Sequence, residues 1–237
     1  MKIFSFFSKN KCESKYLDKQ KDIISNVNNS SEDKYSVADA KAIFYDAIAS
    51  HIGWNPVKSK MYLKKTIGDI VFEINFFSSK WNMSYEIVGV NLDFRFRSKK
   101  INNSSGGCYS FRPSQGYWYD ISTPEKLSLV VDEVCKKIDS IILPLCKGFD
   151  DDFLGTVINL CDLRYFNRFH TSLQFLDFYV EREYILPLVK YCIAAPYAKK
   201  EVEKYLSGNK SKEGKKWSNP NLDYILDNEL YLLVVDK

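Results

Sequence analysis

The sequence lacks the motifs that most often identify an enzyme or a metalloprotein. It contains only two histidines, His51 and His170, and neither belongs to a His-x-x-x-His or His-Glu-x-x-His motif, which excludes metal sites of those types. No Gly-x-Gly-x-x-Gly motif, Walker loop or Gly-x-Ser-x-Gly elbow is present either, so phosphate cradles and hydrolase triads are not indicated. From motifs alone we assign no cofactor, no metal ligands and no catalytic residues.

Disulfide and membrane signals are also missing. The six cysteines stand at positions 12, 108, 135, 146, 161 and 192. They form no Cys-x-x-Cys pair and no regular framework, so we expect free thiols. No apolar run approaches the roughly 18 residues of a membrane span, and the apolar start at residues 1–7 is too short for an export signal. These absences predict a soluble, cytoplasmic protein.

Alternating apolar residues dominate the middle of the chain. Residues 70–76 and 88–96 each place apolar side chains at every second position, the period of a half-buried strand. We expect strands near 61–67, 70–78 and 85–97, joined as an antiparallel meander. Between 108 and 119, Pro113 and Gly116 allow only an interrupted or edge strand, with 117–121 pairing at that edge.

Helical periodicity flanks this sheet. A stripe from Val37 to Ile48 predicts a helix that opens near Ser36 and closes at Gly53. Thr123 before Pro124 predicts a second helix start, and this helix should end or kink at Pro144. Further helices are expected at 153–164, at 172–191 with a break near Pro187, and at 196–206, followed by an apolar strand or buried tail at 230–235.

These elements predict an α+β fold with three regions. Residues 1–35 read as a tail and polar linker, because residues 9–35 are rich in Lys, Asp, Ser and Asn. Residues 36–150 form the α+β domain, a meander of about four strands with helices on one face. Residues 151–237 form a helical extension, in which 207–218 is a polar loop.

Charge is distributed unevenly along the chain. Residues 55–104 contain nine Lys or Arg and four Asp or Glu, whereas residues 120–183 contain seven and twelve. Three interpretations of this basic segment and this acidic segment are open. The two patches face each other across the fold, they lie on solvated surfaces, or they mark a site for a charged partner. The candidate partner-binding residues are Lys64, Lys65, Arg95, Arg97, Lys99 and Lys100.

The run from Phe94 to Lys100 allows two interpretations. Rings that stack on bases and cations that contact phosphates would make it a single-stranded nucleic-acid site. Alternation favours the other interpretation, because Phe94 and Phe96 point to the face opposite Arg95 and Arg97. We therefore predict rings in the core and cations in water.

Two further groups of residues carry side chains of the types used in metal binding or catalysis. Asp150, Asp151 and Asp152 lack the spacing of a calcium loop and are better explained by the start of the helix at Phe153. An enzyme remains an alternative only if distant residues meet in the fold. Its candidate residues are Tyr117, Tyr119, Asp120, His170 and Glu181.

Residues 38–150 resemble a bacterial family known as the domain-of-unknown-function 4304 family. The resemblance rests on Ile52-Gly53-Trp54, on residues 71–77 and 88–94, on Trp118-Tyr119-Asp120 and on Leu143-Pro144-Leu145. It implies an immunity-type binding module that covers a partner protein, and it supplies no catalytic residues. We accordingly expect a non-catalytic protein-binding module, with single-stranded nucleic-acid binding as the alternative.

Overall fold

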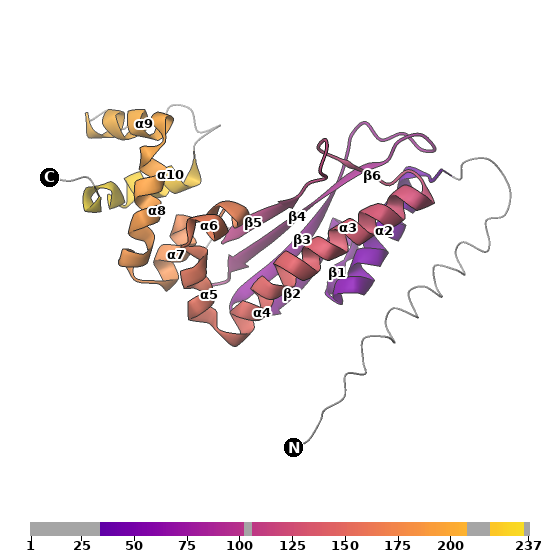
Figure 1. Cartoon of the computed structure of the whole chain (residues 1–237), viewed down its shortest axis with the longest axis horizontal. Helices are drawn as coiled ribbons and strands as arrows, with labels where there is room; N and C mark the ends of the chain where they lie inside the picture. Colours follow the sequence, from indigo (N-terminus) through magenta and orange to yellow (C-terminus); the bar gives the residue numbers. More distant parts are fainter. Residues whose placement is uncertain (1–33, 102–105, 208–218, 235–237) are drawn as a thin grey trace, which may run out of the picture. The chain divides into compact units, whose positions relative to one another are not determined.

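The computed structural model describes residues 34–101, 106–207 and 219–234 (Figure 1). These residues belong to one compact unit, and their class is α+β, as predicted. The predicted linker at 9–35 and the predicted polar loop at 207–218 lie largely outside the described residues. The predicted boundary after residue 150 falls at the end of a helix, α4 (Leu143–Asp151).

The sheet is an antiparallel meander of five strands in chain order, and a short sixth strand pairs with the start of β4. The strands are β1 (Asn55–Val57), β2 (Tyr62–Ile67), β3 (Ile70–Ser78), β4 (Gly89–Ser98), β5 (Gly107–Phe111) and β6 (Tyr119–Asp120). The strands predicted near 61–67 and 70–78 are β2 and β3, the interrupted edge strand predicted between 108 and 121 is β5 with β6, and β1 is an additional strand of three residues.

The third long strand starts later than predicted. We expected a strand from residue 85, but β4 begins at Gly89. The preceding residues form a loop that an isolated bridge between Met83 and Ile87 closes. Within it, Tyr85 has a φ of 65°, a left-handed backbone conformation that cannot continue a strand.

Side-chain alternation gives the sheet two unlike faces. Phe72, Ile74, Phe94 and Phe96 are fully buried on one face. Arg95 and its neighbours along β4 at every second position point to the other. Trp54 packs near Phe72 and Phe94 on the buried face. The prediction that rings enter the core and arginines face water is confirmed.

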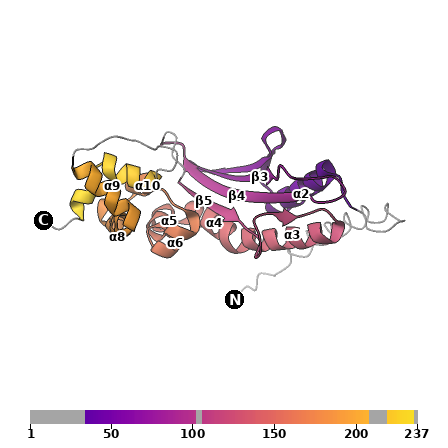
Figure 2. The same ribbon diagram turned by 90° about the horizontal axis from the view of Figure 1, so that it is seen from above.

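Helices cover the buried face of the sheet (Figure 2). The first, α2 (Val37–Ile52), begins and ends as predicted, because the Ser36 side chain accepts the Asp39 amide and Gly53 adopts a left-handed conformation. The helix α3 (Pro124–Lys137) starts after Thr123, again as predicted.

Pro144 does not end the second helix. A π-helical turn, η2 (Ile138–Ile142), connects α3 to α4, and in it the Leu143 amide donates to the Ile138 carbonyl five residues earlier. Proline has no amide hydrogen and disrupts regular i to i−4 bonding. The wider turn shifts the bonding pattern just before Pro144, and the chain stays helical to Asp151.

The remaining described chain is helical. Its elements are α5 (Phe153–Leu160), α6 (Leu163–Phe169), α7 (Leu173–Tyr179), α8 (Arg182–Ala194), α9 (Pro196–Leu206), α10 (Pro220–Asp227) and a 3₁₀ turn, η3 (Leu230–Leu233). The predicted break at Pro187 is wrong in position, because Pro187 lies inside α8 and the chain instead extends at Val180 and Glu181. The apolar strand or buried tail predicted at 230–235 is, over its described residues, a 3₁₀ turn in which Leu230 and Tyr231 are buried and Leu232 and Leu233 are exposed.

Aromatic rings join these helices to the sheet. Phe96 lies 5.6 Å from Phe149 of α4, 6.3 Å from Phe169 of α6 and 5.4 Å from Phe175 of α7, measured between ring centroids. The helices α5 to α10 gather at this end of the sheet, and the β3–β4 loop lies at the opposite end (Figures 1 and 2). The opposite end is therefore free of the C-terminal helices.

Candidate binding surface

One face of the sheet carries no helix in the part of the chain that the structure describes (Figure 2). Strand pairing places Lys64, Glu73 and Arg95 in one row across this open face. Arg97 follows two residues later on β4 and lies 3.5 Å from Glu73. We use the name open face for the side of the sheet that presents these residues.

The structure brings together only half of the predicted partner-binding residues. Lys64, Arg95 and Arg97 share the open face. Lys65 pairs with the buried Phe72 and therefore points to the other side of the sheet. Lys99 and Lys100 lie beyond the end of β4.

Acidic neighbours pair with three of these six cations, Arg95, Arg97 and Lys100. Arg95 lies 3.8 Å from Asp93, and Lys100 lies 2.5 Å from Asp69. Only about a fifth of the Glu73 and Asp93 side chains is exposed, at 22% and 21%. The carboxylates beside the arginines would repel the phosphates of a nucleic acid. Phe94 and Phe96 are buried and cannot stack on bases.

Large exposed apolar side chains, most of them aromatic, occur at the end of the sheet that lies away from the C-terminal helices (Figure 1). They come from the end of β3, from the β3–β4 loop and from the β5–β6 loop. The large exposed side chains are Phe77, Trp81, Met83, Tyr85, Ile87, Tyr117 and Trp118. We call this set the aromatic end; the exposed fraction reaches 73% at Trp81 and 63% at Tyr85.

Contacts of Gly89, Asn82 and Asn91 bring the β3–β4 and β5–β6 loops together at the start of β4. A side chain at Gly89 would meet Trp118 Cβ at 3.2 Å and Ser79 Cβ at 3.4 Å, so both loops approach the start of β4 closely. The side-chain amide of Asn82 donates to the Gly89 carbonyl and accepts from the Gly89 backbone N–H. On the next outward position, the Asn91 amide donates to the Tyr117 carbonyl. These contacts hold the β5–β6 loop against the base of the β3–β4 loop, whereas the tip of the β3–β4 loop bonds the segment before α2, where the Tyr85 amide donates to the Tyr35 carbonyl.

The sequence contained a usable signal for the aromatic end. Trp81, Tyr117 and Trp118 fall in segments predicted to be loops or edges, where side chains are exposed, whereas Tyr85 fell at the start of the strand predicted at 85–97. Their side chains show no period-two alternation, because they lie in loops, so a strand pattern does not reveal them. Two cations also lie here: Lys80 Nζ is 4.8 Å from the Trp81 ring, and the Arg112 guanidinium is 5.4 Å from the Tyr117 ring.

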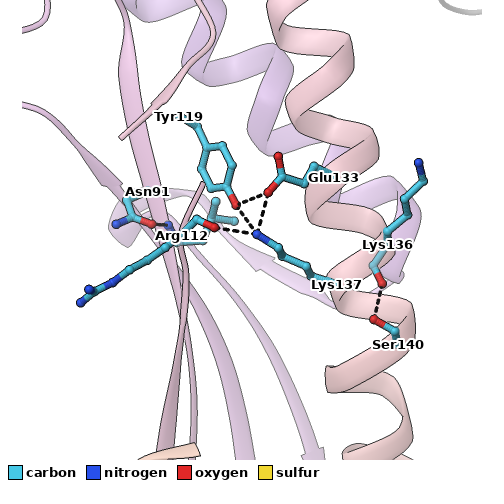
Figure 3. A network of polar contacts seen from close by, with 8 residues as sticks. Asn91, Arg112, Tyr119, Glu133, Lys136, Lys137 and Ser140 are labelled. Atoms are coloured by element: carbon cyan, nitrogen blue, oxygen red, sulfur yellow. Dashed lines mark hydrogen bonds and ion pairs between the residues drawn. The ribbon is translucent and has the colours of Figure 1, made fainter. Parts of the chain in front are cut away.

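A polar network anchors the β5–β6 loop to α3 (Figure 3). Lys137 Nζ donates to the Arg112 carbonyl at 2.6 Å, to the Tyr119 hydroxyl at 2.8 Å and to Glu133 Oε1 at 2.6 Å. The Tyr119 hydroxyl also donates to Glu133 Oε1 at 3.1 Å. Burial raises the pKa of Tyr119, and Glu133 raises it further, so the phenol stays protonated and can donate.

We expect Lys137→Met to loosen this loop. The variant keeps most of the apolar stem but removes three donated bonds, which should lower the free energy of unfolding by about 1–2 kcal/mol. Denaturant titration measures the loss, and hydrogen exchange should rise at residues 112–118. The control is Lys136→Met, because the Lys136 side chain points away from the network (Figure 3). Equal losses in both variants would contradict the anchoring role.

The five residues of the enzyme alternative do not form one site. Tyr117, Tyr119 and Asp120 lie near β6, whereas His170 ends α6 and Glu181 precedes α8, near the other end of the sheet (Figure 1). Burial works against ionisation of Asp120, but bonds from Lys126 and Ser122 keep its pKa below the ordinary value. Asp120 is therefore an ion-pair partner of Lys126 at 2.8 Å and a poor proton donor at neutral pH.

His170 lines a cavity of about 1170 Å³ between α6, α8 and the start of α10. The described lining residues include Asn167, Thr171, Cys192 and Asn221 but no carboxylate. A histidine that acts as a general base is usually oriented by an acidic partner, and none of the described residues supplies one here.

The described cysteines are unpaired, as predicted for them; Cys12 lies outside the described residues. Burial raises the pKa of Cys146 to about 12 and that of Cys161 to about 11, so both are thiols at neutral pH. Asp152 caps α5 by accepting the Gly155 amide, which confirms its structural role. The described residues contain no group of three or more acidic, His or Cys side chains arranged to hold a metal ion.

None of the described helices is long and apolar enough to cross a bilayer. Comparisons of the chain with family models, with curated proteins and with solved structures find no match. The resemblance to the domain-of-unknown-function 4304 family therefore stays a prediction from the sequence.

Proposed function

We propose that this chain is a non-catalytic protein-binding module whose contact surface is the aromatic end together with the adjoining open face. One observation carries the proposal: large aromatic side chains of the β3–β4 and β5–β6 loops are exposed at the end of the sheet that lies away from the described C-terminal helices (Figure 1). Contiguous exposed apolar patches are uncommon on monomers and typically mark interaction sites.

The residue types support a protein partner. Tyr, Trp and Arg are enriched in protein interfaces and in the few residues that dominate binding energy. The aromatic end contains two tryptophans and two tyrosines, and Arg112 lies over one of the tyrosine rings. The resemblance noted in the sequence adds an immunity-type partner, a protein that this chain would cover, as the expected kind of complex.

We expect site-specific photo-crosslinking to test the proposal. A benzophenone amino acid at Tyr85 or Tyr117, in cells of the organism that carries the gene, should yield one discrete protein adduct. The same amino acid at Leu129, which is 70% exposed on α3, should yield none. No discrete adduct at either tyrosine, or equal adducts at all three positions, would contradict the proposal, and adducts to RNA or DNA alone would favour the nucleic-acid alternative.

A further inference from the structure

The cations at the aromatic end differ from those along the strands. Arg95, Arg97 and Lys100 each have an acidic partner within 4.0 Å. Lys80 and Arg112 form no ion pair with any described residue and lie over aromatic rings. The β3–β4 and β5–β6 loops contain a single acidic residue, Glu86. The net charge available to an incoming group at this end is therefore positive.

The geometry pairs each available cation with an apolar surface. An arginine stacked on a tyrosine keeps its N–H donors at the edge of the ring, where they can bind a carboxylate. Figure 3 shows the Arg112 side chain pointing away from the Lys137 network, so network bonding does not occupy its guanidinium. Lys80 lies over the exposed Trp81 ring, and the Trp118 ring packs edge-on against Tyr117, the ring that Arg112 covers.

From this we infer the chemistry of the partner, and the inference rests on the proposed function. We propose that the aromatic end binds an acidic segment of the partner protein in which Asp or Glu side chains flank large apolar side chains. The carboxylates would contact Lys80 and Arg112, and the apolar groups would pack on the tryptophan rings. Charge complementarity of this kind sets specificity and speeds association.

The acidic helices of a second copy of this chain are an alternative occupant of the aromatic end, because they also carry negative charge. Residues 120–183 contain twelve acidic and seven basic residues, so a second copy could present its helical layer to the aromatic end. That arrangement would appear as concentration-dependent self-association of the purified chain. Sedimentation that shows dimers or larger species, lost in a Trp81→Ala variant, would overturn the proposal in favour of self-assembly.

The test uses polymers of defined chemistry as probes. Tryptophan fluorescence of the full chain should change on titration with a random copolymer of glutamate and tyrosine. Poly-glutamate should bind at least about tenfold more weakly, and a copolymer of lysine and tyrosine should not bind. Equal affinity for the two tyrosine copolymers, or tighter binding of an oligo-thymidine strand than of the glutamate–tyrosine copolymer, would overturn the proposal.

Charge-reversal variants locate the effect. Lys80→Glu combined with Arg112→Glu should weaken binding of the glutamate–tyrosine copolymer at least about tenfold. The matched control, Lys136→Glu with Lys190→Glu, changes net charge equally at exposed positions of α3 and α8 and should weaken it less than about twofold. Circular dichroism confirms that each variant is folded. An equal loss in both double variants would show nonspecific attraction and overturn the proposal.

The same variants separate this inference from the proposed function. Crosslinked adducts at Tyr85 that persist unchanged in the Lys80→Glu, Arg112→Glu background would support a protein partner but refute its acidic character. Loss of the adducts in the Lys80→Glu, Arg112→Glu background, with retention in the Lys136→Glu, Lys190→Glu background, supports both the protein partner and its acidic character. Absence of adducts in the unmodified chain refutes the proposed function itself.

Discussion

Phe96→Ala is expected to lower the free energy of unfolding by about 3–5 kcal/mol. The Phe96 ring is fully buried and lies near the rings of Phe94, Phe149, Phe169 and Phe175. Its removal leaves a cavity at the point where the sheet meets α4, α6 and α7. Because the surrounding rings come from four different elements, they cannot close the cavity without moving the backbone.

Denaturant titration followed by far-UV circular dichroism measures this loss. The control is Phe178→Ala, because Phe178 is 52% exposed and should cost less than about 1 kcal/mol. If the two variants lose similar stability, Phe96 does not join the sheet to the C-terminal helices in the way described. Separate unfolding transitions in Phe96→Ala, where the unmodified chain has one, would identify Phe96 as the coupling residue between these layers.

The second large effect is expected at Gly107. A Cβ atom there would lie 2.5 Å from the Phe96 ring and 2.9 Å from the Phe169 carbonyl oxygen. The Phe96 ring is confined by its neighbours, and the carbonyl belongs to the backbone, so neither can move away cheaply. We expect Gly107→Ala to destabilise the fold by about 1–3 kcal/mol, the usual cost of overpacking a core.

Thermal and denaturant unfolding test this effect, with Cys108→Ala as the control on the same strand. Cys108 pairs with Arg95, so its side chain faces the open side of the sheet, and its removal leaves the ring cluster intact. A neutral Gly107→Ala would mean that β5 does not approach Phe96 as closely as described. Combining Gly107→Ala with Phe96→Leu should recover part of the loss, because the smaller side chain makes room for the new methyl group.

Local patterns were sufficient to predict most of the fold. The caps of α2 are set by Ser36 and Gly53, residues whose short-range bonding and left-handed preference act within one turn. The alternation along β3 and β4 placed Phe72, Phe94 and Phe96 on one face, since strand geometry leaves no other option. The start of α3 at Pro124 has the same local origin.

Other outcomes were not set by the local pattern alone. The sequence predicted an end or a kink at Pro144, and the π-helical turn before it keeps the chain helical to Asp151. Pro187 stays within α8, and the break falls at Val180 and Glu181, a position that no proline or glycine marks. The candidate partner-binding cations do not all share one face, because Lys65 faces the other side of the sheet, and Arg97 lies beside Glu73 of the neighbouring strand.

The amino-acid sequence by itself determined the α+β class, the two-faced sheet and the helix starts, because each depends on side chains within a few residues of one another. Only the tertiary structure decided which surface is available for binding. Gly89 and Asn91 bring together two loops about 30 residues apart in the chain, and the register of β3 with β4 neutralises Arg97 while Lys80 and Arg112 keep no acidic partner among the described residues. Loop approach and cross-strand pairing are long-range contacts, and a local sequence pattern does not encode them.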